Sequence, residues 1–116
     1  MIKIINLTLY KNEKIVNIYN DIKSLYNDNT HIFNIENVKT TLSNNIFKRE
    51  TNEYSFILDI INKEATYFLK DKNMTFNVDV EKVLYSEEKN NIILEYKISS
   101  DEETFKILIE SSDNNE

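Results

Sequence analysis

Arg49 is the side chain in this sequence that most invites a chemical explanation. It is the single arginine of 116 residues in a chain that otherwise takes its positive charge from lysine. Side chains alternate between the faces of a strand, so Arg49 shares a face with Phe47 and is expected to point into an apolar interior. A guanidinium there needs a carboxylate, a carbonyl or an anionic ligand, since an unpaired buried charge is costly. The pattern predicts a small pocket that binds a carboxylate or phosphate through a bidentate contact. The alternative is an ion pair at the rim of a filled core.

Four other side chains are candidates for the same interior surface. His31 shares a face with Phe33, and Thr40 shares a face with Leu42, by the same period of two. We predict no catalytic residue, because a catalytic histidine needs a nucleophile or metal partner and none lies nearby in the sequence. The candidate ligand-binding residues are Arg49, His31, Thr40, Tyr67 and Tyr96.

Metal and cofactor sites are not expected. The chain has no cysteine and one histidine, which argues against a structural zinc site. The acidic cluster Asp101-Glu102-Glu103 lacks the ligand spacing and the glycine of a calcium loop, so we interpret it as a solvated turn. A phosphate-binding loop of the glycine-rich kind is excluded because the chain contains no glycine.

The composition also limits the expected cellular location of the protein and the kinds of partner that it can bind. The absence of cysteine fits a reducing compartment, and the N-terminal segment is too short and too interrupted for a signal peptide, so we expect a cytoplasmic protein. The net charge of −6 argues against binding to nucleic acids or anionic membranes, since phosphate contacts need clustered cations. Without glycine or proline, the turns are expected to rely on asparagine and aspartate, which tolerate positive φ.

Alternation of apolar and polar residues dominates the rest of the chain. We expect nine or ten short strands separated by hairpin-length loops, hence an all-β antiparallel barrel or sandwich of about eight to ten strands. Residues 1–110 form one domain in this interpretation, and residues 111–116 form an acidic disordered tail. The clearest expected strands are 31–36, 38–43, 45–50, 54–60, 64–70, 73–83, 91–99 and 103–111.

Residues 13–26 are compatible with two structures. Ile15, Ile18, Tyr19 and Ile22 recur at helical spacing, and this periodicity by itself favours an amphipathic helix. A strand requires a bulge at Asn20-Asp21, which would shift the alternation.

Four segments between residues 30 and 110 occur in a characteristic order. They are Val38-Lys39-Thr40-Thr41-Leu42, Phe47-Lys48-Arg49, Tyr67 with Met74-Thr75-Phe76-Asn77-Val78, and Glu87-Glu88-Lys89-Asn90-Asn91 before Ile93-Leu94-Glu95-Tyr96. Through these segments, residues 30–110 resemble the YwiB-like family of small bacterial proteins, a domain of unknown function with a calycin-like β-barrel. The resemblance implies a barrel and makes residues 13–26 a bent strand, which is the structure we predict. It implies no reaction.

Taken together, these observations predict a non-catalytic barrel that binds a small, partly apolar, anionic ligand, with Arg49 as the polar anchor. The alternative is an acidic interaction or inhibitor module that binds a basic partner protein. An enzymatic function is the third alternative. A second copy of the chain, forming a homodimer, is a further expected partner.

Overall fold

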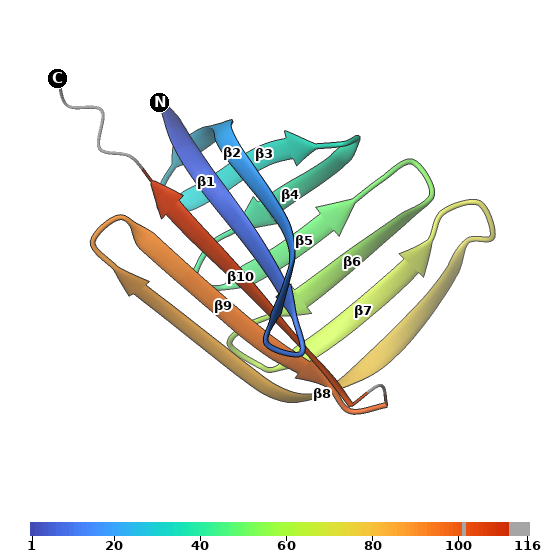
Figure 1. Ribbon diagram of the computed structural model, residues 1–116. Helices are drawn as coiled ribbons and strands as arrows, with labels where there is room; N and C mark the ends of the chain where they lie inside the picture. Colours follow the sequence, from blue (N-terminus) through green and yellow to red (C-terminus); the bar gives the residue numbers. More distant parts are fainter. Residues whose placement is uncertain (101, 112–116) are drawn as a thin grey trace, which may run out of the picture.

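The chain forms a closed antiparallel β-barrel in which strands that follow one another in sequence lie side by side (Figure 1). The computed structural model describes residues 1–100 and 102–111. Its strands are β1 (Ile2–Lys11), β2 (Lys14–Asn27), β3 (Thr30–Ile35), β4 (Val38–Leu42), β5 (Ile46–Glu50), β6 (Tyr54–Asp59), β7 (Glu64–Leu69), β8 (Met74–Glu88), β9 (Asn91–Ile98) and β10 (Glu103–Ser111). The barrel closes because β1 also pairs with β10. The predicted all-β antiparallel barrel is confirmed.

Residues 13–26 are almost entirely within the bent strand β2, and they do not form a helix. The pairing of β2 with β1 shifts so that Asn20 and Asp21 together face Asn6. Asp21 has a φ of 58°, and its amide donates a hydrogen bond of 3.0 Å to Oδ1 of Asn6. The extra residue is a β-bulge, which lets Tyr19 and Ile22 on either side of it both pack against the core. The predicted bent strand and the position of its bulge are confirmed.

The turns use more residue types than the sequence predicts. Eleven of the described residues have positive φ, and six of these are asparagine or aspartate. The other five are glutamate or lysine, so the expectation of turns made by asparagine and aspartate is only half correct. Two-residue hairpin turns of type I′ need positive φ at both central positions, and the pairs that meet this condition are Asn12-Glu13, Asp28-Asn29 and Glu36-Asn37. A left-handed conformation costs a non-glycine residue roughly 1–2 kcal/mol, a cost this chain bears at each such site.

The inward side chains of β3 to β8 form rows of directly opposed residues, because the strands are in register. One row, the core row, is almost completely buried except at its last member. Its packing fills one end of this part of the barrel, as expected for a small barrel. The core row consists of His31, Leu42, Phe47, Leu58, Ala65 and Val78.

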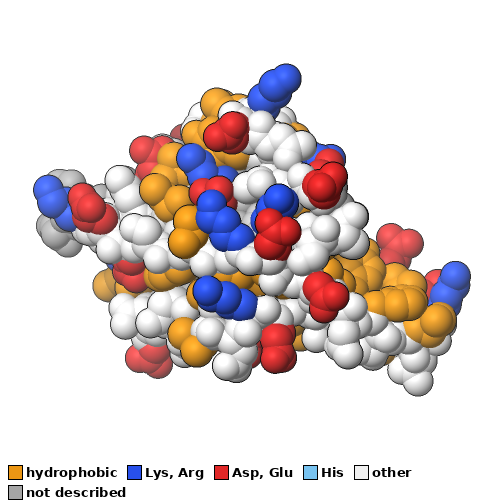
Figure 2. Space-filling model, turned by 90° about the horizontal axis from the view of Figure 1, so that it is seen from below, with side chains coloured by type: hydrophobic (Ala, Val, Ile, Leu, Met, Phe, Trp, Pro, Cys, Tyr) orange, Lys and Arg blue, Asp and Glu red, His pale blue; other side chains and the backbone are white. Residues whose placement is uncertain are grey.

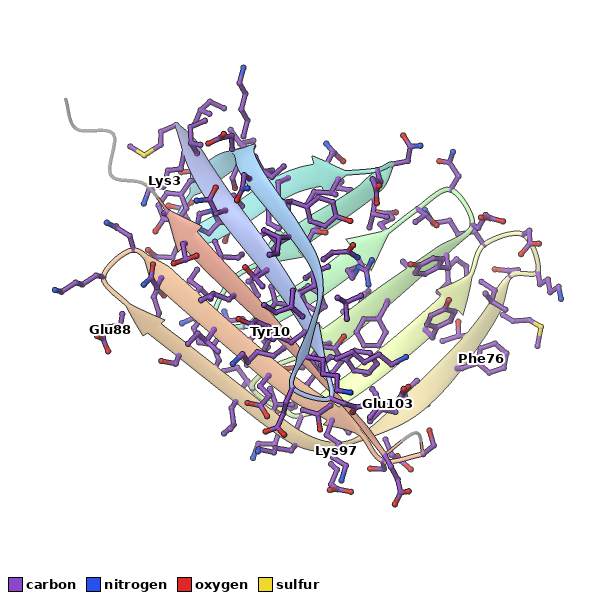
Figure 3. The ribbon with its side chains drawn as sticks, viewed as in Figure 1. Lys3, Tyr10, Phe76, Glu88, Lys97 and Glu103 are labelled. Atoms are coloured by element: carbon purple, nitrogen blue, oxygen red, sulfur yellow. The ribbon has the colours of Figure 1, made fainter. Side chains whose placement is uncertain are left out.

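The next row along the strands, the Arg49 row, becomes progressively more exposed. It runs from the buried Phe33 to Phe76, which is 43% exposed although it faces the concave side of the sheet. Figure 3 shows Phe76 near the start of β8. A step of two residues along each strand therefore leads from a filled core to an open mouth. The Arg49 row consists of Phe33, Thr40, Arg49, Phe56, Tyr67 and Phe76.

The mouth is open because two strand pairings are short. β2 pairs with β3 only through residues 25–27 and 30–32, so most of β2 has no neighbour on that side among the described residues. β8 pairs with β7 from Met74 to Asp79 and with β9 from Val80 onward, with a register shift between Val80 and Lys82. β8 starts one residue later and ends five residues later than the predicted strand 73–83. Met74 and Phe76, on the apolar face of that strand, are exposed at the open end.

The end of the barrel differs by one residue from the predicted end of the domain at residue 110. β10 ends at Ser111, so the barrel includes one residue of the predicted tail. Residues 112–116 lie outside the described residues. The described part of the chain forms no helix that is long and apolar enough to cross a membrane.

Acidic and lysine side chains are interspersed on the outer surface. On the face shown in Figure 2, the two signs lie next to each other and form no extended area of one charge. Several of these lysine and glutamate side chains form ion pairs with one another. The ion pairs are Lys11–Glu103 (2.9 Å), Lys48–Glu50 (3.7 Å), Lys70–Glu50 (2.8 Å), Lys82–Glu95 (3.7 Å) and Lys97–Glu81 (3.1 Å).

Candidate functional site

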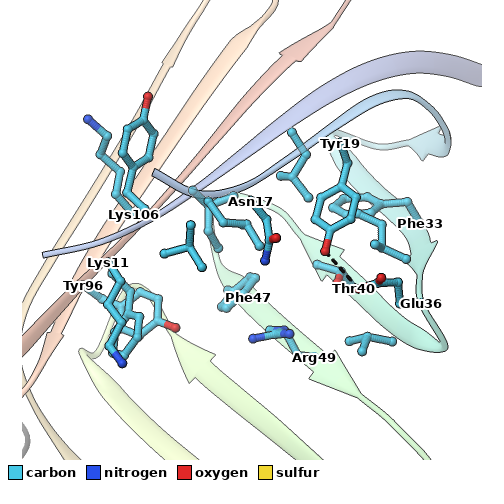
Figure 4. Close-up of a pocket in the computed structure, with 18 residues that line it drawn as sticks. Lys11, Asn17, Tyr19, Phe33, Glu36, Thr40, Phe47, Arg49, Tyr96 and Lys106 are labelled. Carbon is cyan, nitrogen blue, oxygen red and sulfur yellow. Dashed lines mark hydrogen bonds between the residues drawn. The ribbon is translucent and has the colours of Figure 1, made fainter. Parts of the chain in front are cut away.

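Two hollows meet at Arg49 inside the open half of the barrel. We call the first the aliphatic hollow; its volume is about 260 Å³, and Figure 4 shows its lining. We call the second the aromatic hollow; its volume is about 350 Å³. Arg49, Tyr96 and Phe105 line both hollows, so the guanidinium lies where they adjoin.

The two hollows differ in the chemistry of their remaining walls. The apolar wall of the aliphatic hollow includes Leu7, Leu9, Val16, Phe33, Ile35, Val38, Phe47 and Ile107, with Thr40, Tyr19 and Glu36 among its polar groups. The aromatic hollow is completed by Tyr54, Phe56, Tyr67, Val78, Ile98 and Ser100.

The strand period places Arg49 in this position. Phe47 and Arg49 point inward from β5, while Lys48 and Glu50 point outward, where Glu50 accepts a hydrogen bond of 2.8 Å from Lys70. The Lys70 hydrogen bond and the nearby Lys48 lower the pKa of the Glu50 carboxyl. The nearest acidic residue in sequence is therefore turned away from Arg49 and is paired with lysines instead.

Arg49 is half-buried, as predicted, but its expected acidic or carbonyl partner is missing. Within residues 1–100 and 102–111, the guanidinium makes no hydrogen bond and no ion pair. Its direct cross-strand neighbours are Thr40 on β4 and Phe56 on β6, neither of which carries a charge. The prediction of an internal partner is wrong because the inward face of β4 to β6 has no carboxylate in register with Arg49.

Two further polar groups near Arg49 are also without partners. The hydroxyls of Thr40 and Tyr96 make no hydrogen bond to the described residues, although both side chains are more than nine-tenths buried. No fully enclosed side-chain oxygen or nitrogen of the described residues lacks a partner, so both hydroxyls must reach open space. Burial raises the pKa of Tyr96 to about 12, against the opposing effect of the Arg49 charge, so its hydroxyl is a donor at neutral pH.

Five aromatic side chains line the aromatic hollow together with Arg49. Tyr54 and Tyr67 are stacked, with ring centres 5.1 Å apart and planes at 8°. Tyr96 and Phe105 form a second stack, at 5.3 Å and 27°. Phe56 contacts a member of each stack, with its centre 6.5 Å from Tyr67 and 6.0 Å from Tyr96. The array joins residues from β6, β7, β9 and β10 that are far apart in sequence.

Glu36 is a pocket residue that sequence reasoning missed. It lies in the β3–β4 turn, and the Tyr19 hydroxyl of β2 donates a hydrogen bond of 3.0 Å to its carboxylate (Figure 4). This hydrogen bond is the main reason why the pKa of Tyr19 is raised. The contact bridges the side of the mouth where β2 and β3 do not pair. No sequence signal indicates it, because β2 and the turn approach one another only in the closed barrel.

His31 is separated from the other candidates. Neither hollow includes His31 among its described lining residues. It is buried in the core row, where Nδ1 and the Ser24 hydroxyl are 2.9 Å apart and the Tyr26 ring centre is 4.7 Å away. Burial lowers the pKa of His31 to about 4, and the nearby Lys3 charge adds to this effect. His31 is therefore a neutral core residue at pH 7, and the prediction that it faces the same pocket as Arg49 is wrong.

The remaining candidates do come together. Arg49, Thr40 and Tyr96 line the aliphatic hollow, and Arg49, Tyr67 and Tyr96 line the aromatic hollow. Among the described residues, no group of three or more histidine, cysteine, aspartate or glutamate side chains is placed to hold a metal ion.

Comparisons of the chain with protein-family models, with curated proteins and with solved structures gave no match. The resemblance to the YwiB-like family therefore stays a prediction.

Proposed function

We propose that this protein is a non-catalytic binding protein for a small, partly apolar anion, and that Arg49 is the anchor for its charged group. The observation that carries the proposal is the position of Arg49. It is half-buried where two hollows meet, and no counter-charge among the described residues contacts it. An unpaired charge removed from water is unfavourable, and a bound anion would supply the missing partner.

The surrounding groups suit a carboxylate or a phosphate. A guanidinium presents parallel N–H donors that match two oxygens of such a group. The hydroxyls of Thr40 and Tyr96 are further donors that the described residues leave unused. Apolar walls on both sides would bury the rest of the ligand, which is the usual composition of a small-molecule site.

The volumes indicate a small ligand. Sites for drug-sized molecules occupy roughly 300–1,000 Å³. The aromatic hollow, at about 350 Å³, lies at the lower end of that range, and the aliphatic hollow, at about 260 Å³, lies just below it. A ligand of one or two rings, or a short acyl chain, matches these dimensions better than a long-chain lipid does.

Two further expectations belong to this proposal. The closed meander is compatible with a calycin-like barrel, and the lack of cysteine fits a cytoplasmic setting. The alternative function, an acidic inhibitor of a basic partner protein, would be favoured by one continuous acidic stripe. The mixed charges of Figure 2 and the five ion pairs favour ligand binding over that alternative.

The test is calorimetric titration of the purified protein with octanoate and 1-naphthoate, and with octanamide and 1-naphthamide as uncharged counterparts. We expect at least one acid to bind more tightly than its amide. Arg49→Met, which keeps a flexible apolar stem, should weaken that binding about tenfold or more, as loss of a charge-assisted pair implies.

Lys48→Met is the matched control, because Lys48 adjoins Arg49 in sequence but faces outward. It should leave the affinity unchanged. Binding that is equal for acids and amides, or equal losses in the two variants, would refute Arg49 as an anchor. Native mass spectrometry of the freshly purified protein would show any co-purified anion, and it would also test the predicted homodimer.

A further inference from the structure

The aromatic hollow has a wall composition that an aliphatic ligand would not need. Five of its nine lining residues are aromatic, and they form the two ring stacks joined by Phe56. The aliphatic hollow also contains aromatic side chains, six among its 18 lining residues, together with six leucine, isoleucine and valine side chains such as Leu9, Ile35 and Val38. Aromatic rings therefore make up a larger share of the wall on one side of Arg49 than on the other.

These rings are not simply core filling. Phe47, which belongs to the core row, is 1% exposed, whereas Tyr54, Phe56 and Tyr67 are only half-buried. Phe76, directly opposite Tyr67, is 43% exposed on the same concave face. Apolar ring surface left in contact with water at a concave site is stabilised when another apolar surface covers it.

From this arrangement we infer that the ligand is a planar aromatic acid whose ring lies in the aromatic hollow while its carboxylate or phosphate contacts Arg49. The inference rests on the proposed function, because it uses the same anchor. Arg49 and Phe56 are direct cross-strand partners, so their backbones are about one strand spacing apart and both side chains point into the barrel. This adjacency suits an acid group attached directly to a ring, or through a short linker.

Ring stacking supplies the selectivity. An aromatic ligand gains offset-stacked or edge-to-face contacts with the walls in addition to the area that it buries, whereas an alkyl chain gains only the area. The rings of Tyr67 and Phe56, whose planes differ by 57°, present differently oriented surfaces to a ligand ring. A flat ring also has fewer rotatable bonds to fix on binding than an alkyl chain with the same number of carbon atoms.

The experiment compares 1-naphthoate with undecanoate, an aliphatic acid with the same number of carbon atoms, by calorimetric titration. We expect naphthoate to bind at least about tenfold more tightly. 1-Naphthyl phosphate, measured in parallel, reports whether the site prefers a phosphate or a carboxylate on the same ring. Nuclear Overhauser effects between the ligand ring and the rings of Tyr67 and Tyr54 would locate it in the aromatic hollow.

Two variants distinguish the hollows. Tyr67→Leu, on the aromatic hollow only, should weaken naphthoate about fivefold or more and leave undecanoate within about twofold. Val38→Ala, on the aliphatic hollow only, should leave naphthoate unchanged. Tyr67 and Val38 are both half-buried, so we expect both variants to fold; their far-ultraviolet circular dichroism should match that of the parent.

The outcomes separate this inference from the proposed function. If undecanoate binds through Arg49 and naphthoate does not compete with it, the proposed function stands and the aromatic ligand class is wrong. If naphthoate binds but its Overhauser contacts are to Leu9 and Ile35, the assigned hollow is wrong. If neither acid binds, both the inference and the anion-binding function are refuted.

Discussion

Arg49 and Tyr96 line the same two hollows although they come from β5 and β9, strands that are not neighbours in the sheet. The two side chains enter the interior from opposite parts of the barrel. Neither side chain has a hydrogen-bond partner among the described residues. The positive charge of Arg49 acts to lower the pKa of Tyr96, while burial raises it more strongly. A guanidinium and a protonated phenol thus face common open space, which is the arrangement that the proposed anion site requires.

Replacing Arg49 should not destabilise the ligand-free protein. A paired buried arginine would cost several kcal/mol to remove, but here no partner is left unsatisfied. We expect Arg49→Met to leave the free energy of unfolding in urea within about 1 kcal/mol of the parent value, with any change favouring the variant. A loss clearly greater than this would reveal a counter-charge in solution that the structure does not show.

The buried His31 should make stability depend on pH. Its pKa is about 4 in the folded protein and near 6.5 when unperturbed. Between these values the unfolded chain binds more protons, so the free energy of unfolding decreases as the pH falls from 6.5 to 4. The full loss from this group is at most about 3 kcal/mol. Urea denaturation at pH 7, 5.5 and 4.5 would measure it.

The comparison for this prediction is His31→Asn, which retains a polar group beside Ser24. Carboxylates titrate in the same range in both proteins, so the difference between the two pH profiles isolates the histidine. Parallel profiles for the parent and the variant would contradict a depressed pKa for His31.

The β2 bulge should depend on a specific side chain. Oδ1 of Asn6 accepts the amide of Asp21, and Asn6→Ala removes that acceptor. We expect a loss of about 1 kcal/mol in the free energy of unfolding. Asp21→Gly keeps the amide and suits the left-handed φ of 58°, so it should be neutral or slightly stabilising. Equal destabilisation by both changes would argue against the bulge geometry.

Because the chain has no glycine, a substitution to glycine at a turn residue with positive φ should raise its stability. Lys63 has a φ of 58°, so Lys63→Gly relieves roughly 1–2 kcal/mol of strain and costs about 0.5–1 kcal/mol of added freedom in the unfolded chain. The net expectation is a modest rise in thermal midpoint. Lys72→Gly, in the β7–β8 turn, is the control because Lys72 is not among the positive-φ residues. It should lower the midpoint, and the reverse order of the two variants would refute the argument.

The sequence by itself determined which residues alternate into the barrel. The period of two predicted the strands, the inward direction of Arg49 beside Phe47, and the shared face of Thr40 and Leu42, because side-chain direction in a strand is a local property. The spacing of residues 13–26 by itself favoured a helix, and the bent strand with a bulge at Asn20-Asp21 was predicted only with the resemblance to the YwiB-like family. One shift in the alternation of a strand produces a spacing close to that of a helix.

Only the tertiary structure decided how those inward residues group. His31 and Arg49 both point inward, yet register places His31 in the filled core row and Arg49 in the next row, towards the mouth. The exposure of Phe76 likewise depends on where β8 leaves its neighbours, and the Glu36 carboxylate reaches the hollow of Arg49 only because the barrel closes. Local alternation fixes the face of a strand, but depth within a barrel follows from register and closure, which are set by pairings between distant residues.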